Sequence, residues 1–158
     1  MALFDVSTHA PIALFPSDPC ISAIERLKLG YLAEGDINIL HHTPNLIELT
    51  IQSSVNIERW PSPALTALQV LSFNVANWSA TISPPPYIDL VLPFASTLLE
   101  LQLSFPIAVH PSPELVVLLG QLPRLQTLIL TDVHPEPLDL RVLTHLHTLS
   151  MGSYGGSS

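Results

Sequence analysis

Seven histidines and one cysteine are the residues of this chain whose types suit metal binding. His41 and His42 are adjacent. His145 and His147 are separated by one residue, Leu146, so they would share one face of a strand. A zinc site needs about two further ligands beside such a pair. The remaining histidines are scattered among prolines, and Cys20 is remote in sequence. We therefore expect surface and loop histidines, and we predict no metal site.

Glu48 and Glu100 are the carboxylates that could act as a general acid and a general base. They belong to separate segments of the chain, whereas such a pair works at a separation of about 5–10 Å. A catalytic nucleophile needs a nearby base, and the sequence has no G-x-S-x-G motif. Glycine-rich phosphate loops are also missing, since three of the six glycines fall after residue 151. We therefore predict no catalytic residue, no cofactor and no enzymatic activity.

The element that would position these side chains is a repeated pattern, L-x-x-L-x-L. Its clearest copy is L-Q-T-L-I-L at residues 125–130. Copies begin at residues 24, 46, 68, 98, 125 and 146, so neighbouring copies are 21–30 residues apart. A leucine-rich repeat, which is a short strand plus a return segment, has a period of about 20–29 residues. The spacing therefore predicts six strands of this kind.

Alternation within each copy decides which side chains are buried. In the clearest copy Leu128 and Leu130 point to one face, and Thr127 and Ile129 point to the other. One such strand cannot bury its apolar face alone, but parallel stacking with the returns behind buries a continuous core. We predict an α/β leucine-rich-repeat solenoid with a parallel sheet of about six strands and irregular helical or extended returns. An ordinary α/β domain with leucine-rich strands is the alternative.

The sequence divides into three parts. Residues 1–23, interrupted by prolines, are expected to form an irregular N-terminal cap or a degenerate repeat, with short strands at residues 3–6 and 12–15. Residues 24–152 are the predicted leucine-rich-repeat domain, and residues 153–158 are expected to be a flexible tail. The last predicted strand would leave its outer edge open, which favours a covering partner or a longer array.

Three returns are predicted to be helical. They cover residues 36–42, 114–122 and 138–146. Prolines follow the first two segments, and a proline stops a helix because it lacks the amide hydrogen. Each of these helices would be followed directly by the next strand.

Composition excludes several classes of partner. Only five residues are basic, and the net charge is −8, so we predict neither nucleic acid nor membrane as a partner. Charged residues make up 11% of the chain, against about 25% in typical domains, which suggests that part of the surface is covered. One cysteine and no basic-apolar leader favour a reducing compartment, which is the cytoplasm or the nucleus.

The outward side chains of the stacked strands would form one polar sheet face. Solenoids commonly bind proteins on such a face, so we predict a non-catalytic protein-binding surface there for a client of unknown identity. The candidate residues are Arg26, Lys28, Glu48, Thr50, Gln52, Ser72, Asn74, Glu100, Gln102, Thr127, Ile129 and Thr148.

Two of the copies carry a family resemblance. T-P-N-L-I-E-L-T-I at residues 43–51 and L-P-R-L-Q-T-L-I-L at residues 122–130 resemble the leucine-rich repeats of fungal F-box proteins, especially those of mushroom-forming fungi. The resemblance covers about residues 20–152. It implies a ribonuclease-inhibitor-like horseshoe that captures substrates for a cullin-based ubiquitin ligase.

The chain departs from that family in two ways. Residues 1–23 are too short for an F-box, so the resemblance implies a ligase complex only if a longer form carries one. The ninth place of five copies also lacks the usual Asn or Cys, which argues against a buried asparagine ladder. A structural remnant or fragment of a longer leucine-rich-repeat protein, with no independent partner, is the alternative. The ninth-place residues are Ser54, Ala76, Pro106, Val133 and Tyr154.

Overall fold

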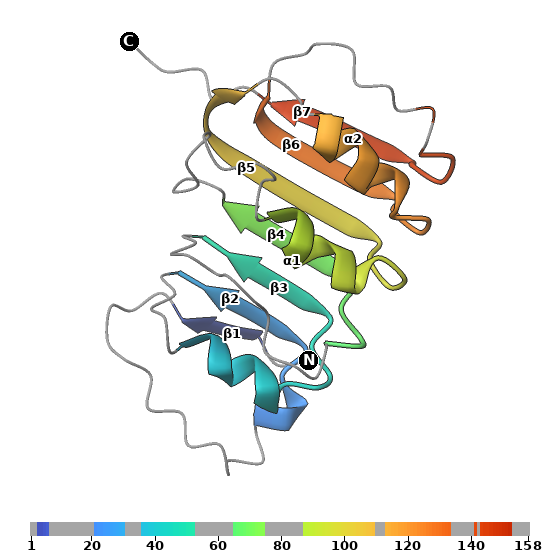
Figure 1. Ribbon diagram of the computed structural model, residues 1–158. Coiled ribbons are helices and arrows are strands. Elements are labelled where there is room, and N and C mark those ends of the chain that lie inside the picture. Colours follow the sequence, from blue (N-terminus) through green and yellow to red (C-terminus); the bar gives the residue numbers. More distant parts are fainter. Residues whose placement is uncertain are drawn as a thin grey trace.

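Seven parallel strands form a single sheet in this computed structural model (Figure 1). The structure describes residues 3–6, 21–30, 36–52, 65–74, 87–109, 113–133, 141 and 143–152. Spatial order follows sequence order from β1 to β7. The strands are β1 (Leu3–Val6), β2 (Arg26–Leu29), β3 (Glu48–Ile51), β4 (Val70–Asn74), β5 (Glu100–Val109), β6 (Thr127–Val133) and β7 (Thr148–Gly152).

The predicted α/β class and parallel sheet are confirmed, but the sheet has one strand more than the six copies of the pattern. The additional strand is β1, which lies within the predicted N-terminal cap and pairs in parallel with β2. The other short strand expected there, at residues 12–15, lies outside the described residues, as does the tail at residues 153–158.

The six copies enter the sheet in one common register. The third residue of every copy occupies the same rung, from Arg26 on β2 to Thr148 on β7. Main-chain bonding repeats too: the N–H groups of Ile47 and Glu48 both donate to the carbonyl of Glu25, at 2.8 and 3.0 Å. A slip of one residue would turn the buried leucines to solvent. Register and core burial therefore support each other.

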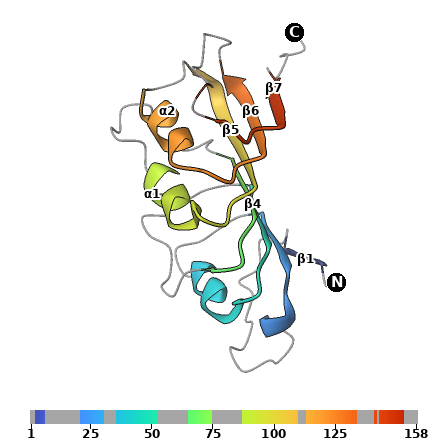
Figure 2. The ribbon, with the colours of Figure 1, turned by 90° about the vertical axis from the view of Figure 1, so that its right-hand side faces the viewer.

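One layer of helices covers one face of the sheet, the face that carries the buried leucines. The α-helices are α1 (Tyr87–Val91) and α2 (Pro113–Gly120), and the 3-10 helices are η1 (Ile21–Ala23), η2 (Asp36–His42) and η3 (Leu92–Phe94). In Figure 2 α1, α2 and η2 lie on one side of the sheet, and the edge strands β1 and β7 lie on the other side of β5. The sheet is therefore bent towards a face that no described element covers.

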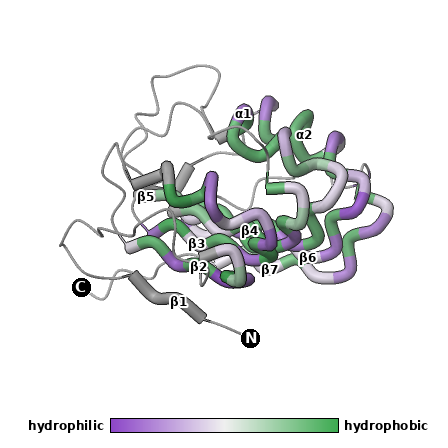
Figure 3. The backbone as a smooth tube through the Cα atoms, turned by 90° about the horizontal axis from the view of Figure 1, so that it is seen from below, coloured by the Kyte–Doolittle hydropathy of each residue, from purple (hydrophilic) through white to green (hydrophobic). Residues whose placement is uncertain are grey.

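The core lies between the sheet and these helices. Leu101 on β5 and Leu118 and Leu119 on α2 are all buried. Along the strands hydrophobic and hydrophilic residues alternate, as Figure 3 shows, which is the pattern expected when only one face of a sheet is packed. The leucines of each copy thus close the core, and the residues between them face outward.

Two of the three predicted helical returns are confirmed, with changed geometry. Residues 36–42 form the 3-10 helix η2, and the predicted helix at residues 114–122 is α2, which ends at Gly120. The third prediction is wrong for residues 143–146. They form a turn, in which the N–H of Leu146 donates to the carbonyl of Leu143 at 3.2 Å. Arg141 is described as helical, of the 3-10 type. No proline stands before the strand that follows the third return, as one does before the strands that follow the first two returns, yet here too the chain enters the strand from a turn and not from a helix.

Thr43 is a buried polar residue at the junction of η2 and β3, with 0% of its surface exposed. Its hydroxyl donates to the carbonyl of Leu40 at 3.3 Å, and its own carbonyl accepts the N–H of Leu46 at 3.1 Å. We expect Thr43→Val to lower the free energy of unfolding by about 1 kcal/mol, because a buried hydrogen bond is lost. Urea unfolding measures this, and Thr66→Val at an exposed site is the control. Equal effects of both changes would contradict the role of Thr43.

The last strand departs from the burial pattern of the others. Leu149 and Met151 occupy the same rungs as Leu128 and Leu130 of β6. The two leucines of β6 are fully buried, whereas Leu149 is 40% and Met151 36% exposed. The open edge expected from the sequence is therefore accompanied by exposure of the core positions on β7.

Candidate protein-binding surface

The predicted candidate residues lie on six neighbouring strands. The structure places them at the outward, alternate positions of β2 to β7, with Gln52 directly after β3. Asn74 is placed by its backbone, which pairs with Ser104 of β5. On β3, for example, Glu48 and Thr50 are half-buried while Leu49 and Ile51 are buried. The predicted alternation is thus present in the sheet.

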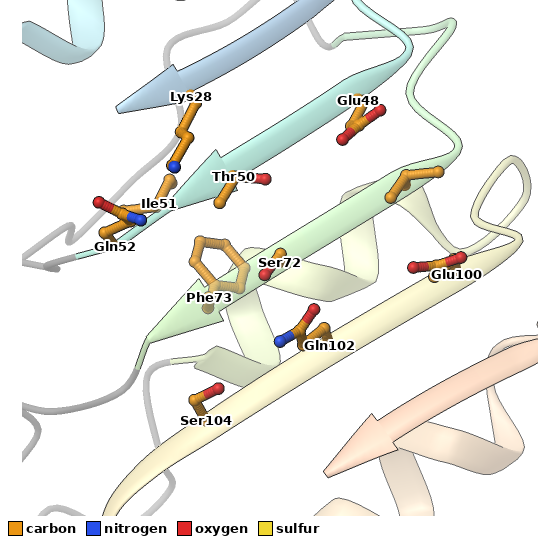
Figure 4. A pocket seen from close by; sticks show the side chains of 11 residues that line it. Lys28, Glu48, Thr50, Ile51, Gln52, Ser72, Phe73, Glu100, Gln102 and Ser104 are labelled. Atoms are coloured by element: carbon orange, nitrogen blue, oxygen red, sulfur yellow. The ribbon is translucent and has the colours of Figure 1, made fainter. Parts of the chain in front are cut away.

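A hollow of about 630 Å³ lies on this face, over β2 to β5 (Figure 4). Seven of the twelve predicted residues line it: Lys28, Glu48, Thr50, Gln52, Ser72, Glu100 and Gln102. Arg26 lies beside Glu48 on the neighbouring strand. The predicted residues of β6 and β7 continue the face beyond the hollow; they are Thr127, Ile129 and Thr148.

Four further residues line the hollow. Val70 and Ser104 occupy the same alternate positions as the predicted residues, so the alternation was a sufficient signal for them. Ile51 and Phe73 are core residues that also reach the hollow. Nothing in their local sequence distinguishes them from the other core positions, so no signal could have identified them.

Two rungs give the hollow its chemistry. On the first rung, Val70 separates Glu48 from Glu100. On the second rung, Thr50 and Gln102 flank Ser72, and Lys28 lies at the β2 side. One end of the hollow is therefore acidic, and its middle offers hydroxyl and amide groups. The carboxylates at one end of such a lining can bind cations and hydrogen-bond donors. The hydroxyl and amide groups in the middle can bind both hydrogen-bond donors and acceptors.

Glu48 forms an ion pair with Arg26 across β2 and β3. The distance from Arg26 Nε to Glu48 Oε2 is 3.1 Å, and the two side chains are 44% and 34% exposed. At this exposure the pair contributes at most about 1 kcal/mol to stability, because water screens it. The contact places the Glu48 carboxylate beside Arg26 of β2.

The histidines considered for metal binding do not come together. His41 and His42 are exposed on η2, with their ring centres 6.5 Å apart. His145 lies in the turn before β7 and His147 directly precedes Thr148, so the two do not share a strand face as expected. Among the residues that the structure describes, no three His, Cys, Asp or Glu side chains are grouped as metal ligands; Cys20 is outside them. That the chain binds no metal stays a prediction.

The two carboxylates considered for catalysis lie on the same rung but two strands apart. Neighbouring strands are about 4.8 Å apart, so their Cα atoms are separated by roughly 10 Å. Glu48 is also held by Arg26. Because Arg26 already binds the Glu48 carboxylate, the arrangement favours a charged surface over an acid–base pair, and the lack of enzymatic activity stays a prediction.

Comparison with known proteins finds no match: no protein-family model, no curated protein and no solved structure is significantly similar to the chain. No helix in the described ranges is long and apolar enough to cross a membrane. Inference about function therefore starts from the geometry of the sheet face.

Proposed function

We propose that the chain is a leucine-rich-repeat solenoid whose outward sheet face binds a protein partner without catalysing a reaction. The observation that carries this proposal is the hollow, which is built from polar side chains of four strands in one register. Stacked copies of one short strand are the arrangement from which solenoids make extended binding faces.

A protein fits this face better than a small molecule does. Small-molecule pockets are mostly apolar and enclose the ligand, whereas charged, hydroxyl and amide side chains predominate in the lining here. The face also continues past the hollow onto β6 and β7. Seven strands at about 4.8 Å spacing span roughly 29 Å, which suits a folded surface or an extended polypeptide.

The resemblance to fungal F-box proteins suggests the role of such binding. By that resemblance the face captures clients for a cullin-based ubiquitin ligase, in a longer form that carries an F-box. A cytoplasmic or nuclear location accords with this role and with the single cysteine of the chain.

Affinity capture of the tagged chain from a fungal lysate, followed by mass spectrometry, tests the proposal. Recovery of a cullin with its adaptor would support the ligase role through contacts other than an F-box. Recovery of other proteins alone would retain the binding role and contradict the ligase role of this chain. Recovery of no protein above the level of an empty-tag control would contradict both.

A structural remnant without an independent partner is the second candidate function. The observation that favours it is the exposure of Leu149 and Met151 on β7, since an array that ends on uncovered core positions resembles a part of a longer one. A chain that unfolds cooperatively as a monomer and retains no protein would support this candidate.

A further inference from the structure

The outer edge of β7 exposes apolar side chains and main-chain groups together. All four residues from Thr148 to Met151 are exposed, including the core positions Leu149 and Met151. In the interior of the sheet the equivalent residues, such as Leu101 and Leu103, are fully buried. An exposed edge strand with an apolar face is a template for pairing with another strand.

Hydrogen bonding to β6 identifies the main-chain groups that face outward. The N–H of Thr148 donates to the carbonyl of Gln126 at 2.9 Å, so Thr148 turns its main-chain groups towards β6. Consecutive residues of a strand turn these groups to opposite sides. Leu149 and Met151 therefore present their N–H and C=O groups to the free edge, and Ser150 lies between them with its groups turned to β6.

Charge distinguishes this edge from the other one. The β7 segment T-L-S-M-G has no charged residue, although the chain carries a net charge of −8. The opposite edge strand, β1, contains Asp5, and charged residues on edge strands oppose pairing. Two identical copies can therefore approach along β7 without like charges meeting within the strand.

We propose that two copies of the chain dimerise through β7, antiparallel, about a two-fold axis at Ser150. In this arrangement Leu149 lies opposite Met151 of the second copy, and Met151 opposite Leu149 of the second copy. These residues carry the outward main-chain groups, so both pairs are hydrogen-bonded pairs that exchange two N–H···O bonds each. Ser150 faces itself in a non-hydrogen-bonded pair, as its orientation towards β6 requires.

The same arrangement covers the exposed core positions. The axis is perpendicular to the sheet, so the inward faces of both copies lie on the same side, and the apolar side chains of β7 meet across the axis. A two-fold pairing also closes after two copies, whereas pairing β7 with β1 of another copy would continue without limit. The dimer therefore pairs the main-chain groups of the β7 edge and leaves no further β7 edge for a third copy.

Sedimentation equilibrium of the full chain over a hundredfold range of concentration tests the stoichiometry. We expect a reversible monomer–dimer equilibrium. Leu149→Lys should weaken it at least tenfold, because two ammonium groups would face the joined apolar stripe. Val117→Lys on α2, which replaces an equally apolar and 61% exposed residue, should leave it unchanged. A monomer at every concentration, or growth beyond two copies, would overturn the proposal.

Oxidative cross-linking tests the position of the axis. Across the axis the two Ser150 Cα atoms would be about 4.5 Å apart, which lies within the range that a disulfide spans. With Cys20→Ser as the background, Ser150→Cys should give a covalent dimer on treatment with oxidised glutathione. Thr148→Cys, which would lie opposite Gly152, and Thr50→Cys in the interior of the sheet should not. Equal cross-linking of all three variants would contradict this pairing.

Discussion

Replacing Leu101 by alanine is expected to lower the free energy of unfolding by about 2–5 kcal/mol, which is the range for fully buried leucines. Leu101 is on β5, and none of its surface is exposed. On the same rung it lies between Leu71 of β4 and Leu128 of β6, both of them also fully buried. The lost side chain would leave a cavity that these neighbours cannot fill without breaking the register. Chemical denaturation followed by circular dichroism measures the effect.

Leu149→Ala is the matched control, because it is the same change on the same rung of the edge strand β7. Leu149 is 40% exposed, so less apolar surface returns to water and little cavity forms. We expect less than half of the loss found for Leu101, measured at a protein concentration at which the chain is monomeric. Equal losses at the two positions would contradict a core that is closed over β5 and open over β7.

Removing the polar groups of the hollow is expected to weaken binding of a client at least tenfold. The change is Glu48→Ala, Glu100→Ala and Gln102→Ala together, at three outward residues of β3 and β5 that line the hollow. A charged group that loses its partner at an interface costs about 2–5 kcal/mol, so even one lost contact would suffice. The measurement is the affinity, by isothermal titration calorimetry, for a partner found by affinity capture.

The control for this triple variant removes similar groups from the helical side. Asp89→Ala, Glu114→Ala and Gln121→Ala also delete two acids and one amide, on or next to α1 and α2. The change in net charge is therefore the same, and we expect unchanged affinity. Both variants should remain folded, and loss of the Arg26–Glu48 pair should lower the unfolding temperature of the hollow variant by no more than about 4 °C. If the control lost as much affinity as the variant of the hollow, the binding surface would not be the sheet face.

Strand positions and register were predictable from the sequence because the leucine spacing leaves one pairing that buries every copy. Glu48, Val70 and Glu100 share a rung, as their equal places in three copies require. The outward positions follow from the same alternation, which is why most of the lining of the hollow could be predicted.

Other features depend on interactions that the pattern does not encode. The short strand expected at residues 3–6 is confirmed, but its parallel pairing with β2 was not predictable, because Leu3–Val6 lacks the L-x-x-L-x-L spacing. At the other end, β5 continues to Val109, with a register shift against β6 between Ser104 and Val109. Asp132 on β6 has a φ of 60° next to this irregularity. Asp tolerates this left-handed conformation better than most residues, but its sequence position gave no sign of it.

The ninth position of the copies is a second case in which the pattern alone does not give the local structure. Val133 stands where regular leucine-rich repeats carry Asn or Cys, and it is buried at the end of β6, paired with Val109 of β5. An apolar residue there contributes to the core but cannot donate hydrogen bonds to the return segment. The missing asparagine was visible in the sequence, whereas the backbone pairing of Val133 with Val109 was not.

Photo-cross-linking to a client tests most directly whether the outward sheet face is the binding surface. A photoreactive phenylalanine analogue would replace Gln102, which lines the hollow on β5, or Gln121, which is exposed after α2. Irradiation with the captured partner should give a covalent complex from position 102 and none from position 121. A complex that forms from position 121 and not from position 102 would contradict binding at the sheet face.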